Sequence, residues 1–259
     1  ALVPADGLEE NGDLDAFARQ IVEQAGNTFE IRQNIPKDVP MVKEPAVMGF
    51  SAAEVDVKKI AAALESGKIK GIAILAGSNN VKYTQDDILA TVAKEFLAND
   101  ILCISDGEAS VSLAKYRLLD PARQKKNCGE GLAELLASLG DKVPAVIDWS
   151  MTDFLTALSG AAQKSLSDYP ICAYFPEASR TVEVTKAMWT VAMGISTYFW
   201  PCLPVTGSPK TQAALTGFCE ERFGASLHVI IQKIDARTKA GYFLKTIKAP
   251  AVLSGKAWE

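Results

Sequence analysis

The sequence predicts an α/β protein with a doubly wound, mostly parallel β-sheet and helices on both of its faces. Short apolar segments alternate with amphipathic helical segments from about residue 70 onward. Turns rich in Gly, Asn and Asp follow several of these segments, and no linker-like stretch divides the chain after about residue 50. Such strands are buried on both faces when right-handed crossover helices connect them in parallel. We therefore expect one Rossmann-like domain over residues 51–259, preceded by an N-terminal helical arm over residues 1–50.

The N-terminal arm is predicted to hold one helix and an extended segment. Residues 14–25 place apolar side chains on one helical face, and Asp13 precedes them as an N-cap candidate. After Gly26 the segment NIPKDVPMVKEPAV carries three prolines, which a helix interior does not accommodate. A second helix is expected over residues 52–65, ending at Gly67.

Strands and helices alternate through the rest of the chain. Strands are expected near residues 72–76, 101–105, 144–148, 171–175, 196–200 and 227–231. Helices are expected near residues 84–98, 108–118, 129–139, 152–166, 181–193, 210–223 and 236–247. The helix over 84–98 has the clearest pattern, because Thr84 and Asp87 form a capping-box-like start before one apolar stripe.

The composition is that of an ordinary globular protein and excludes several classes of partner. The formal net charge is −4 and the pI is about 5.3, so the chain lacks the basic face that nucleic-acid binding needs. Its five cysteines include no C-x-x-C pair, which favours a reduced chain. The N-terminus has no signal-peptide pattern, and the longest apolar stretch, residues 188–200, is too short to span a bilayer. We expect a cytoplasmic protein without membrane insertion.

The turn after the first predicted strand of the sheet holds Gly77, Ser78, Asn79 and Asn80. Parallel strands end at one edge of an open α/β sheet, where such folds bind their ligands. Backbone N–H groups of this turn could hold an anion, and its side chains could hydrogen-bond a small polar ligand. The competing interpretation is that Gly and Asn are turn formers, and turn chemistry alone explains these residues. Neither this turn nor the next matches G-x-G-x-x-G or a P-loop, which argues against dinucleotides and nucleoside triphosphates.

Acidic residues accompany the ends of the next two strands. Asp106 and Glu108 lie in the turn after the second, and Asp148 and Asp153 flank the end of the third. Gathered at one edge, these carboxylates could perform acid–base chemistry or hold a divalent metal. The alternative, which the sequence favours, is that they are N-cap and first-turn residues stabilised by helix dipoles. His228, the single histidine, lies in an apolar strand without ligand-spaced neighbours and is interpreted as structural.

Longer segments, in one order along the chain, carry a resemblance to a known family. They are NIP…VMGFSAAEV, LESGKIKGIAILAGSNNVK, KEFLANDIL, SLAKYRLLDP, CGEGLAELLASLG, PEASRTVEVTKAMWTVAMGI and LPVTGSP. From about residue 35 onward, the chain resembles the C-terminal Rossmann-like domain of nickel-containing anaerobic carbon monoxide dehydrogenases, in the superfamily that also holds the hybrid-cluster (prismane) proteins. The resemblance covers most of the chain, and the motifs are specific only in combination.

The same resemblance identifies site positions at which this chain differs. In the family, three turns typically read Gly-Cys-Asn-Asn, Thr-Gly-Cys and Gly-Ser-Cys-Val-Asp, and their cysteines help to hold the nickel–iron–sulfur cluster that oxidises CO. The matching positions are Ser78, Glu108 and Met151. The family's catalytic lysine falls near Val182, with Lys186 one helical turn further on. The remaining cluster ligands of the family come from domains N-terminal to this region, for which the chain has no counterpart.

An iron–sulfur cluster needs several thiolates, because soft sulfur ligands match its metals. A hydroxyl, a carboxylate and a thioether at three cysteine positions therefore predict no cofactor on this chain, and in particular no nickel–iron–sulfur cluster. The resulting hypothesis is a non-catalytic, cluster-less relative that serves as a structural or regulatory subunit of an anaerobic redox or C1 complex. Its partners would be other protein subunits, such as a dehydrogenase or an acetyl-CoA synthase.

Two other functions are compatible with the same residues. One is a carbon monoxide dehydrogenase-family enzyme with a remodelled site that uses Ser78, Asp106, Glu108 and a remaining thiol, Cys103 or Cys128. Cys103 lies within a strand, so its side chain should face the sheet and not the turn. The other is a small-ligand binding module in the emptied cleft. The candidate lining residues of that cleft are Asn79, Asn80, Asp106 and Asp148, beside Ser78 and Glu108.

Overall fold

The computed structural model describes residues 14–31, 54–77, 86–124, 127–176, 181–200 and 208–229, with a few more positions between 237 and 245. The chain divides into two compact units, Ala1–Pro45 and Ala46–Glu259. The larger unit contains all six strands of the sheet. It also includes every candidate site residue, since these lie between residues 78 and 153.

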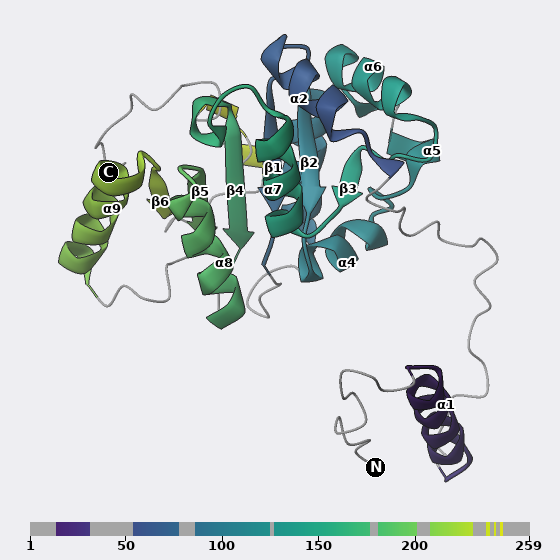
Figure 1. The fold of residues 1–259 in the computed structure, drawn as a ribbon. Helices are drawn as coiled ribbons and strands as arrows, with labels where there is room; N and C mark the ends of the chain where they lie inside the picture. The colour runs from purple at the N-terminus through teal and green to yellow at the C-terminus, as the bar shows by residue number, and fades with distance from the viewer. Residues whose placement is uncertain are drawn as a thin grey trace. The chain divides into compact units, whose positions relative to one another are not determined.

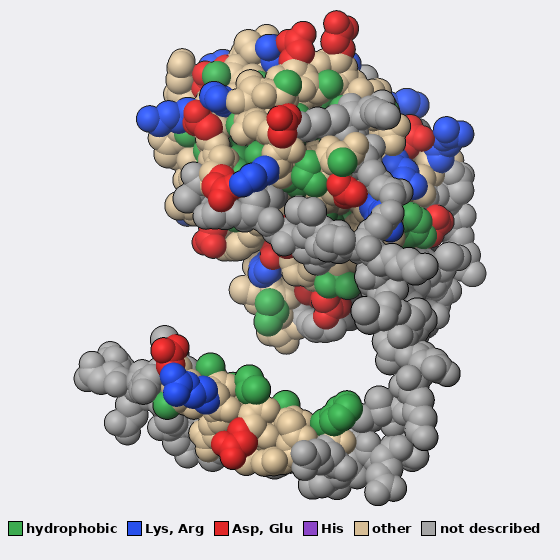
Figure 2. Space-filling view, turned by 90° about the vertical axis from the view of Figure 1, so that its right-hand side faces the viewer, with side chains coloured by type: hydrophobic (Ala, Val, Ile, Leu, Met, Phe, Trp, Pro, Cys, Tyr) green, Lys and Arg blue, Asp and Glu red, His purple; other side chains and the backbone are tan. Residues whose placement is uncertain are grey.

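The described part of the first unit is helix α1 (Leu14–Ile31; Figure 1). A helix is confirmed at this place, but its predicted end at residue 25 is wrong, because the helix continues through Gly26. A glycine inside a helix costs about 1 kcal/mol relative to alanine and does not by itself end the helix. Val22 and Phe29 of this helix are exposed. Figure 2 shows hydrophobic side chains along one side of α1. The expected N-cap Asp13 and the proline-containing segment lie outside the described residues.

The second unit contains one six-stranded sheet. Its strands are β1 (Gly71–Leu75), β2 (Ile101–Ser105), β3 (Val146–Asp148), β4 (Ile171–Pro176), β5 (Ser196–Trp200) and β6 (Leu227–Val229). The spatial order is β3-β2-β1-β4-β5-β6, and every neighbouring pair is parallel. The chain winds outward from β1 in one direction and from β4 in the other. The predicted doubly wound, parallel sheet is thus confirmed.

Helices connect the strands and flank the sheet (Figure 1). They are α2 (Val57–Glu65), α3 (Asp87–Ala98), α4 (Glu108–Lys115), α5 (Pro121–Gln124), α6 (Glu130–Leu139), α7 (Met151–Ala161), the 3₁₀ helix η4 (Leu166–Asp168), α8 (Thr181–Ala192) and α9 (Pro209–Phe223). Helix α3 packs its apolar stripe against β1 and β2, and α8 packs against β4 and β5. The helices predicted near 84–98, 129–139, 181–193 and 210–223 are confirmed.

Helix α4 ends earlier than the sequence predicts. The expected end is residue 118, whereas α4 ends at Lys115. Arg117 adopts a left-handed φ of 56°, and the backbone N–H of Leu118 donates to the Leu113 carbonyl at 3.0 Å. This closing turn ends the helix, and Leu118 within it is buried in the core.

Helix α7 also ends early, at Ala161 and not at the predicted residue 166. The next backbone N–H groups do not make helical hydrogen bonds. Instead, Gln163 N–H donates to Glu65 Oε1 at 2.9 Å, and Lys164 N–H donates to the Tyr169 hydroxyl at 3.2 Å. The Tyr169 hydroxyl in turn donates to Glu65 Oε1 at 2.8 Å. These side chains supply the hydrogen bonds that further helical turns would have made.

Other boundaries shift less, or lie outside the described residues. Helix α2 begins at Val57 and not at residue 52, because Asp56 is its N-cap and accepts a hydrogen bond from the Lys58 backbone N–H at 3.1 Å. Strand β3 begins at residue 146 and not at 144. Thr84 of the expected capping box, residues 230–231 and most of the helix predicted over 236–247 lie outside the described residues.

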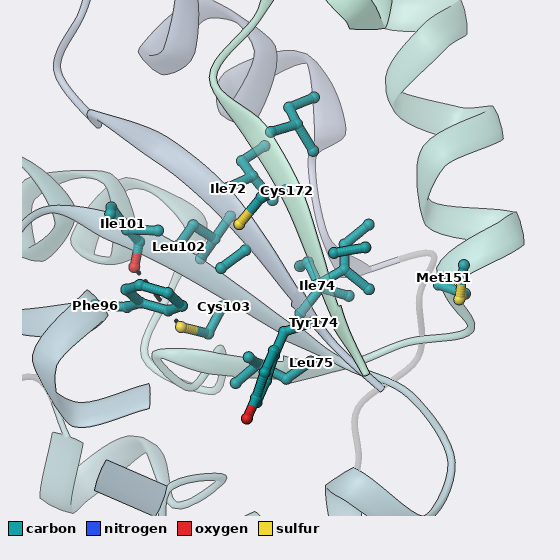
Figure 3. Close-up of a cluster of buried hydrophobic side chains, with 14 of the residues drawn as sticks. Ile72, Ile74, Leu75, Phe96, Ile101, Leu102, Cys103, Met151, Cys172 and Tyr174 are labelled. Carbon is teal, nitrogen blue, oxygen red and sulfur yellow. Dashed lines mark hydrogen bonds between the residues drawn. The ribbon is translucent and has the colours of Figure 1, made fainter. Parts of the chain in front are cut away.

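The core lies around the central strands. Every residue of β1 and β2 is buried, as is the apolar stripe of α3. Figure 3 shows the centre of this cluster, where Phe96 of α3 lies beside Cys103 of β2. Burying a side chain such as Phe96 contributes about 1.5–3 kcal/mol, and coverage of both faces explains why these strands are continuous apolar runs. Among the described residues, no helix is long and apolar enough to cross a membrane.

Candidate functional site

The carboxyl ends of the parallel strands form one edge of the sheet, which we call the carboxyl edge. Strands β1 and β4 are neighbours, although the chain leaves them in opposite directions, so the topological switch point lies between them. Open α/β sheets bind ligands at this point. The described turn residues after β2 and β3 belong to this edge. Ser78, Asn79 and Asn80, predicted in the turn after the first strand, lie outside the described residues.

Asp106 follows β2 and lies at the switch point. Its backbone N–H donates to the Leu75 carbonyl at the end of β1, at 3.0 Å. Its side chain is 8% exposed and accepts a charge-assisted hydrogen bond from Lys186 Nζ at 2.6 Å. Lys186 belongs to α8, the helix that follows β4, so the ion pair reaches across the switch point. The sequence does not reveal this pair, because 80 residues separate its partners.

A second polar contact joins the ends of β2 and β3. Ser105 ends β2 and is in register with Asp148, which ends β3. Ser110 of α4 lies next to both, because its hydroxyl oxygen is 2.9 Å from that of Ser105 and it donates to Asp148 Oδ1 at 2.7 Å. Ser105 is fully buried, so its hydroxyl requires such a partner. The sequence signal for Ser110 is a polar residue on the buried face of an amphipathic helix.

Two positions that match family cysteines have opposite surroundings. Glu108 is the first residue of α4, follows Gly107 with its φ of +64°, and is exposed. Met151 is the first residue of α7, has no exposed surface and belongs to the hydrophobic cluster (Figure 3). The carboxylate is favourable in a first helical turn because of the helix dipole, and the thioether fills space in the core.

The acidic residues of the carboxyl edge have separate roles. Asp106 is paired with a lysine, and Asp148 accepts a hydrogen bond from a serine. Glu108 and Asp153 occupy first helical turns, as the alternative favoured by the sequence has it. In the part of the chain that the structure describes, no three His, Cys, Asp or Glu side chains form a group that could hold a metal ion.

The two thiols considered for a remodelled site do not lie in the turns of the carboxyl edge. Cys103 is fully buried in the middle of β2, and burial, with Cys172 and Cys128 as smaller causes, raises the pKa of its thiol well above the ordinary value. Cys128 precedes α6 near the start of β2, where the next residue's N–H donates to the Leu97 carbonyl at 2.8 Å. Burial and then Asp100 raise the pKa of the Cys128 thiol to about 11. Thiols of this kind are protonated at neutral pH and weak as nucleophiles or metal ligands.

His228 lies in β6, where the sequence places it. Its ring stacks on that of Tyr198, with centroids 4.4 Å apart and an interplanar angle of 8°. Burial lowers the pKa of His228 to about 4, so the ring is neutral at physiological pH. The stacking supports the structural interpretation of this histidine.

An open, doubly wound sheet of parallel strands defines the class of Rossmann-like α/β domains. A family model described as the Prismane/CO dehydrogenase family matches residues 5–231. The chain belongs to this family, and the resemblance inferred from the sequence motifs is confirmed.

Individual relatives support the same assignment. The chain is similar to carbon monoxide dehydrogenase 2 of Carboxydothermus hydrogenoformans, with 27% identity over 265 residues, covering 93% of this chain and 41% of that protein. It is similar to the carbon monoxide dehydrogenase/acetyl-CoA synthase subunit beta of Moorella thermoacetica, with 28% identity over 80% of this chain and 35% of that protein. The solved structure of carbon monoxide dehydrogenase IV from Carboxydothermus hydrogenoformans matches with a TM-score of 0.75 and 29% identity, over 92% of this chain and 41% of that one. The chain thus spans less than half the length of these relatives.

Proposed function

We propose that this chain is a cluster-less carbon monoxide dehydrogenase-like protein that acts as a non-catalytic structural or regulatory subunit of an anaerobic redox or C1-metabolism complex. The observation that carries the proposal is the set of residues at the family's cysteine positions, namely Ser78, Glu108 and Met151. In this proposal residues 1–50 are an arm and residues 51–259 are the dehydrogenase-like domain.

The donor atoms on this chain do not fit a nickel–iron–sulfur cluster. Such clusters are held by thiolates, which are soft and negatively charged. Glu108 offers a hard carboxylate, Ser78 a hydroxyl, and Met151 a neutral thioether that is fully enclosed by the core. A metal at these positions would have to draw Met151 out of its packing, at a loss comparable to removing a buried apolar side chain.

The family's catalytic lysine position provides further support. Val182 stands near that position, and its aliphatic side chain, which is 65% exposed, supplies neither a proton donor nor a charge. Lys186, one turn further along α8, holds the Asp106 carboxylate at 2.6 Å. This contact gives Lys186 a role in the fold, which supports the proposal of a non-catalytic chain.

The proposed partners are larger protein subunits of the same metabolism. One relative is by name a subunit of carbon monoxide dehydrogenase/acetyl-CoA synthase. A chain that keeps this domain but lacks the cluster ligands could occupy the surface of a partner subunit that the corresponding domain of an active dehydrogenase contacts. The absence of a C-x-x-C pair among its cysteines and its acidic composition favour a cytoplasmic protein whose complex includes neither nucleic acid nor membrane.

Metal analysis after anaerobic purification tests the cluster-less state. We expect nickel and iron well below one atom per chain, and no iron–sulfur absorption band after incubation with iron, sulfide and nickel. Carbon monoxide dehydrogenase 2 of Carboxydothermus hydrogenoformans, purified in parallel, should retain its metals and serves as the control. Near-stoichiometric nickel and iron on this chain would refute the proposal and favour the enzyme with a remodelled site.

Affinity purification of the tagged chain from its native host tests the subunit role. We expect a dehydrogenase or acetyl-CoA synthase subunit to be retained in a fixed ratio to the chain. Recovery of the chain alone, or only as copies of itself, would contradict the role as a subunit even if the metal analysis agreed.

A further inference from the structure

The ion pair between Lys186 and Asp106 connects the two halves of the doubly wound sheet. Asp106 belongs to the half built from β1, β2 and β3, and Lys186 to the half built from β4, β5 and β6. Among the described residues, the last backbone hydrogen bond between the halves toward the carboxyl edge is that from the Ala76 N–H to the Tyr174 carbonyl, at 3.0 Å. The ion pair extends this connection beyond the ends of the strands.

The burial of the two side chains is unequal. The Asp106 side chain is 8% exposed, whereas that of Lys186 is 33% exposed. A carboxylate removed from water to this extent depends on its cation, because breaking a buried pair by removing one partner leaves an uncompensated charge. The pair therefore resists separation of the α8 segment from the turn after β2.

We propose that Lys186 and Asp106 form a clasp, meaning an ion pair that fixes the turn between β2 and α4 against α8 and thereby holds the carboxyl edge together at the switch point. The clasp consists only of residues of this chain and acts without any bound group. Its role stands whether or not the proposed function is correct. Any ligand that enters at the switch point must either accommodate the clasp or open it.

A second lysine–aspartate pair provides a matched comparison. Lys115 Nζ lies 2.9 Å from Asp86 Oδ2, and the Asp86 side chain is also 8% exposed. Both of its partners lie in the first half of the sheet, since Asp86 immediately precedes α3 and Lys115 ends α4. The two pairs have the same chemistry and carboxylate burial, but only the clasp joins the halves.

Hydrogen–deuterium exchange of the full chain tests the proposal. In Lys186→Met, we expect amides of both the turn over residues 105–110 and helix α8 to exchange faster, on the order of tenfold. Asp106→Asn should have the same effect at the same two places, and the double variant should exchange no faster than either single variant. Lys115→Met should accelerate exchange around α3 and α4 and leave α8 unchanged.

Unchanged α8 exchange in Lys186→Met would overturn the clasp. So would a double variant whose acceleration equals the product of the two single effects. If Asp106→Asn does not fold, Lys186→Arg replaces it as the test. Because arginine keeps the positive charge, residues 105–110 and α8 should exchange more slowly in Lys186→Arg than in Lys186→Met. Glu183, one turn earlier on α8, is also buried, so Glu183→Gln shows whether Lys186 acts through that carboxylate instead. If Glu183→Gln alone reproduced the Lys186→Met pattern, the clasp would be refuted.

Discussion

The amino edge of the sheet, where the parallel strands begin, and its carboxyl edge both contain lysine–aspartate ion pairs, but only the amino edge also has a backbone approach that excludes a Cβ among the described glycines. At the amino edge, backbone segments approach so closely that only glycine fits. A Cβ on Gly131 would collide with the backbone carbonyl oxygen of Lys68. At the carboxyl edge, side chains make the connections, as in the ion pair of Lys186 with Asp106. The first kind of contact rejects any added atom, whereas the second depends on which side chains are present.

Asp100 organises the amino edge around the start of helix α6. Its carboxylate accepts a hydrogen bond from the Leu132 backbone N–H at 3.1 Å and pairs with Lys70 Nζ at 3.0 Å. Its own backbone has a left-handed φ of 61°, and a Cβ on Gly129 would collide with its carboxylate. Helix α6 is thus held to the sheet by a side-chain cap and by two glycines whose substitution would force atoms together.

This difference between backbone packing at the amino edge and side-chain contacts at the carboxyl edge explains how a family member can keep its fold while the residues of its site change. Packing at the amino edge and the buried strands specify the sheet, and neither involves the turns after β1, β2 and β3. Substitutions in those turns change the side chains of the carboxyl edge and leave the strands in place. Glu108 and Met151 illustrate this tolerance, because one faces solvent and the other joins the core.

The largest effect is expected from adding one methyl group at the amino edge. Gly131→Ala should lower the free energy of unfolding by about 3 kcal/mol, because a backbone carbonyl cannot move aside as a flexible side chain can. Urea denaturation of the full chain measures this loss. Gly217→Ala on α9 is the matched control, since a Cβ there has no atom within 4 Å. It should instead stabilise the helix by up to about 1 kcal/mol. Equal stability of the two variants would show that the backbone around Lys68 can shift to make room for the added methyl group.

The next effect concerns the charge of Asp100. Burial raises the pKa of its carboxyl, but hydrogen bonds from Leu132 and Lys70 lower it more, so the folded state has the lower pKa. Stability from this group is present above the ordinary aspartate pKa of about 4 and is lost as the pH falls through the folded-state pKa. Asp100→Asn should therefore cost about 1.5 kcal/mol at pH 7, and this cost should shrink as the pH falls through the folded-state pKa. Urea midpoints measured across this range test the sign, and a constant difference would contradict it.

The fold was predictable from the sequence because its signals are local and repeated. Each strand is a short apolar run, and each crossover helix has its own apolar stripe, so one misplaced boundary does not alter the topology. The misplaced end of α7 depends on a distant partner, because Glu65 binds the segment after Ala161. Local patterns contain no information about such contacts.

The site was less predictable, for the same physical reason. Gathering of acidic residues at one edge follows from parallel strands, but the partner of each carboxylate is decided by tertiary contacts. Lys186 and Ser110 are such partners, and neither stands in a turn motif. Met151 occupies the first position of a helix, from which a side chain can face either solvent or the core. Only the packing of α7 decides that it is buried.

A smaller effect should follow from removing one hydroxyl at the carboxyl edge. Ser110→Ala leaves the buried Ser105 hydroxyl without its partner and should cost about 1 kcal/mol in urea denaturation. The double variant Ser105→Ala/Ser110→Ala removes both hydroxyls and should recover the part of this loss that comes from the Ser105 hydroxyl, while Asp148 still lacks its hydrogen bond from Ser110. Such recovery would support the view that side-chain contacts at this edge are exchangeable. A double variant whose loss equals the sum of the single losses would show that each serine is needed separately.

The smallest effect is expected at Met151, which is both a buried core residue and one of the positions that match a family cysteine. Met151→Leu keeps the volume and apolar character of a fully buried side chain, so the free energy of unfolding should fall by less than about 1 kcal/mol. Iron and nickel content after anaerobic purification should not change, because the thioether fills the core and does not hold a metal. Met151→Ala controls for the burial, since a cavity at this site should cost about 2–4 kcal/mol. If leucine preserved stability but altered the metal content, Met151 would be a ligand, and the carboxyl edge would be a functional metal site and not a rearranged one.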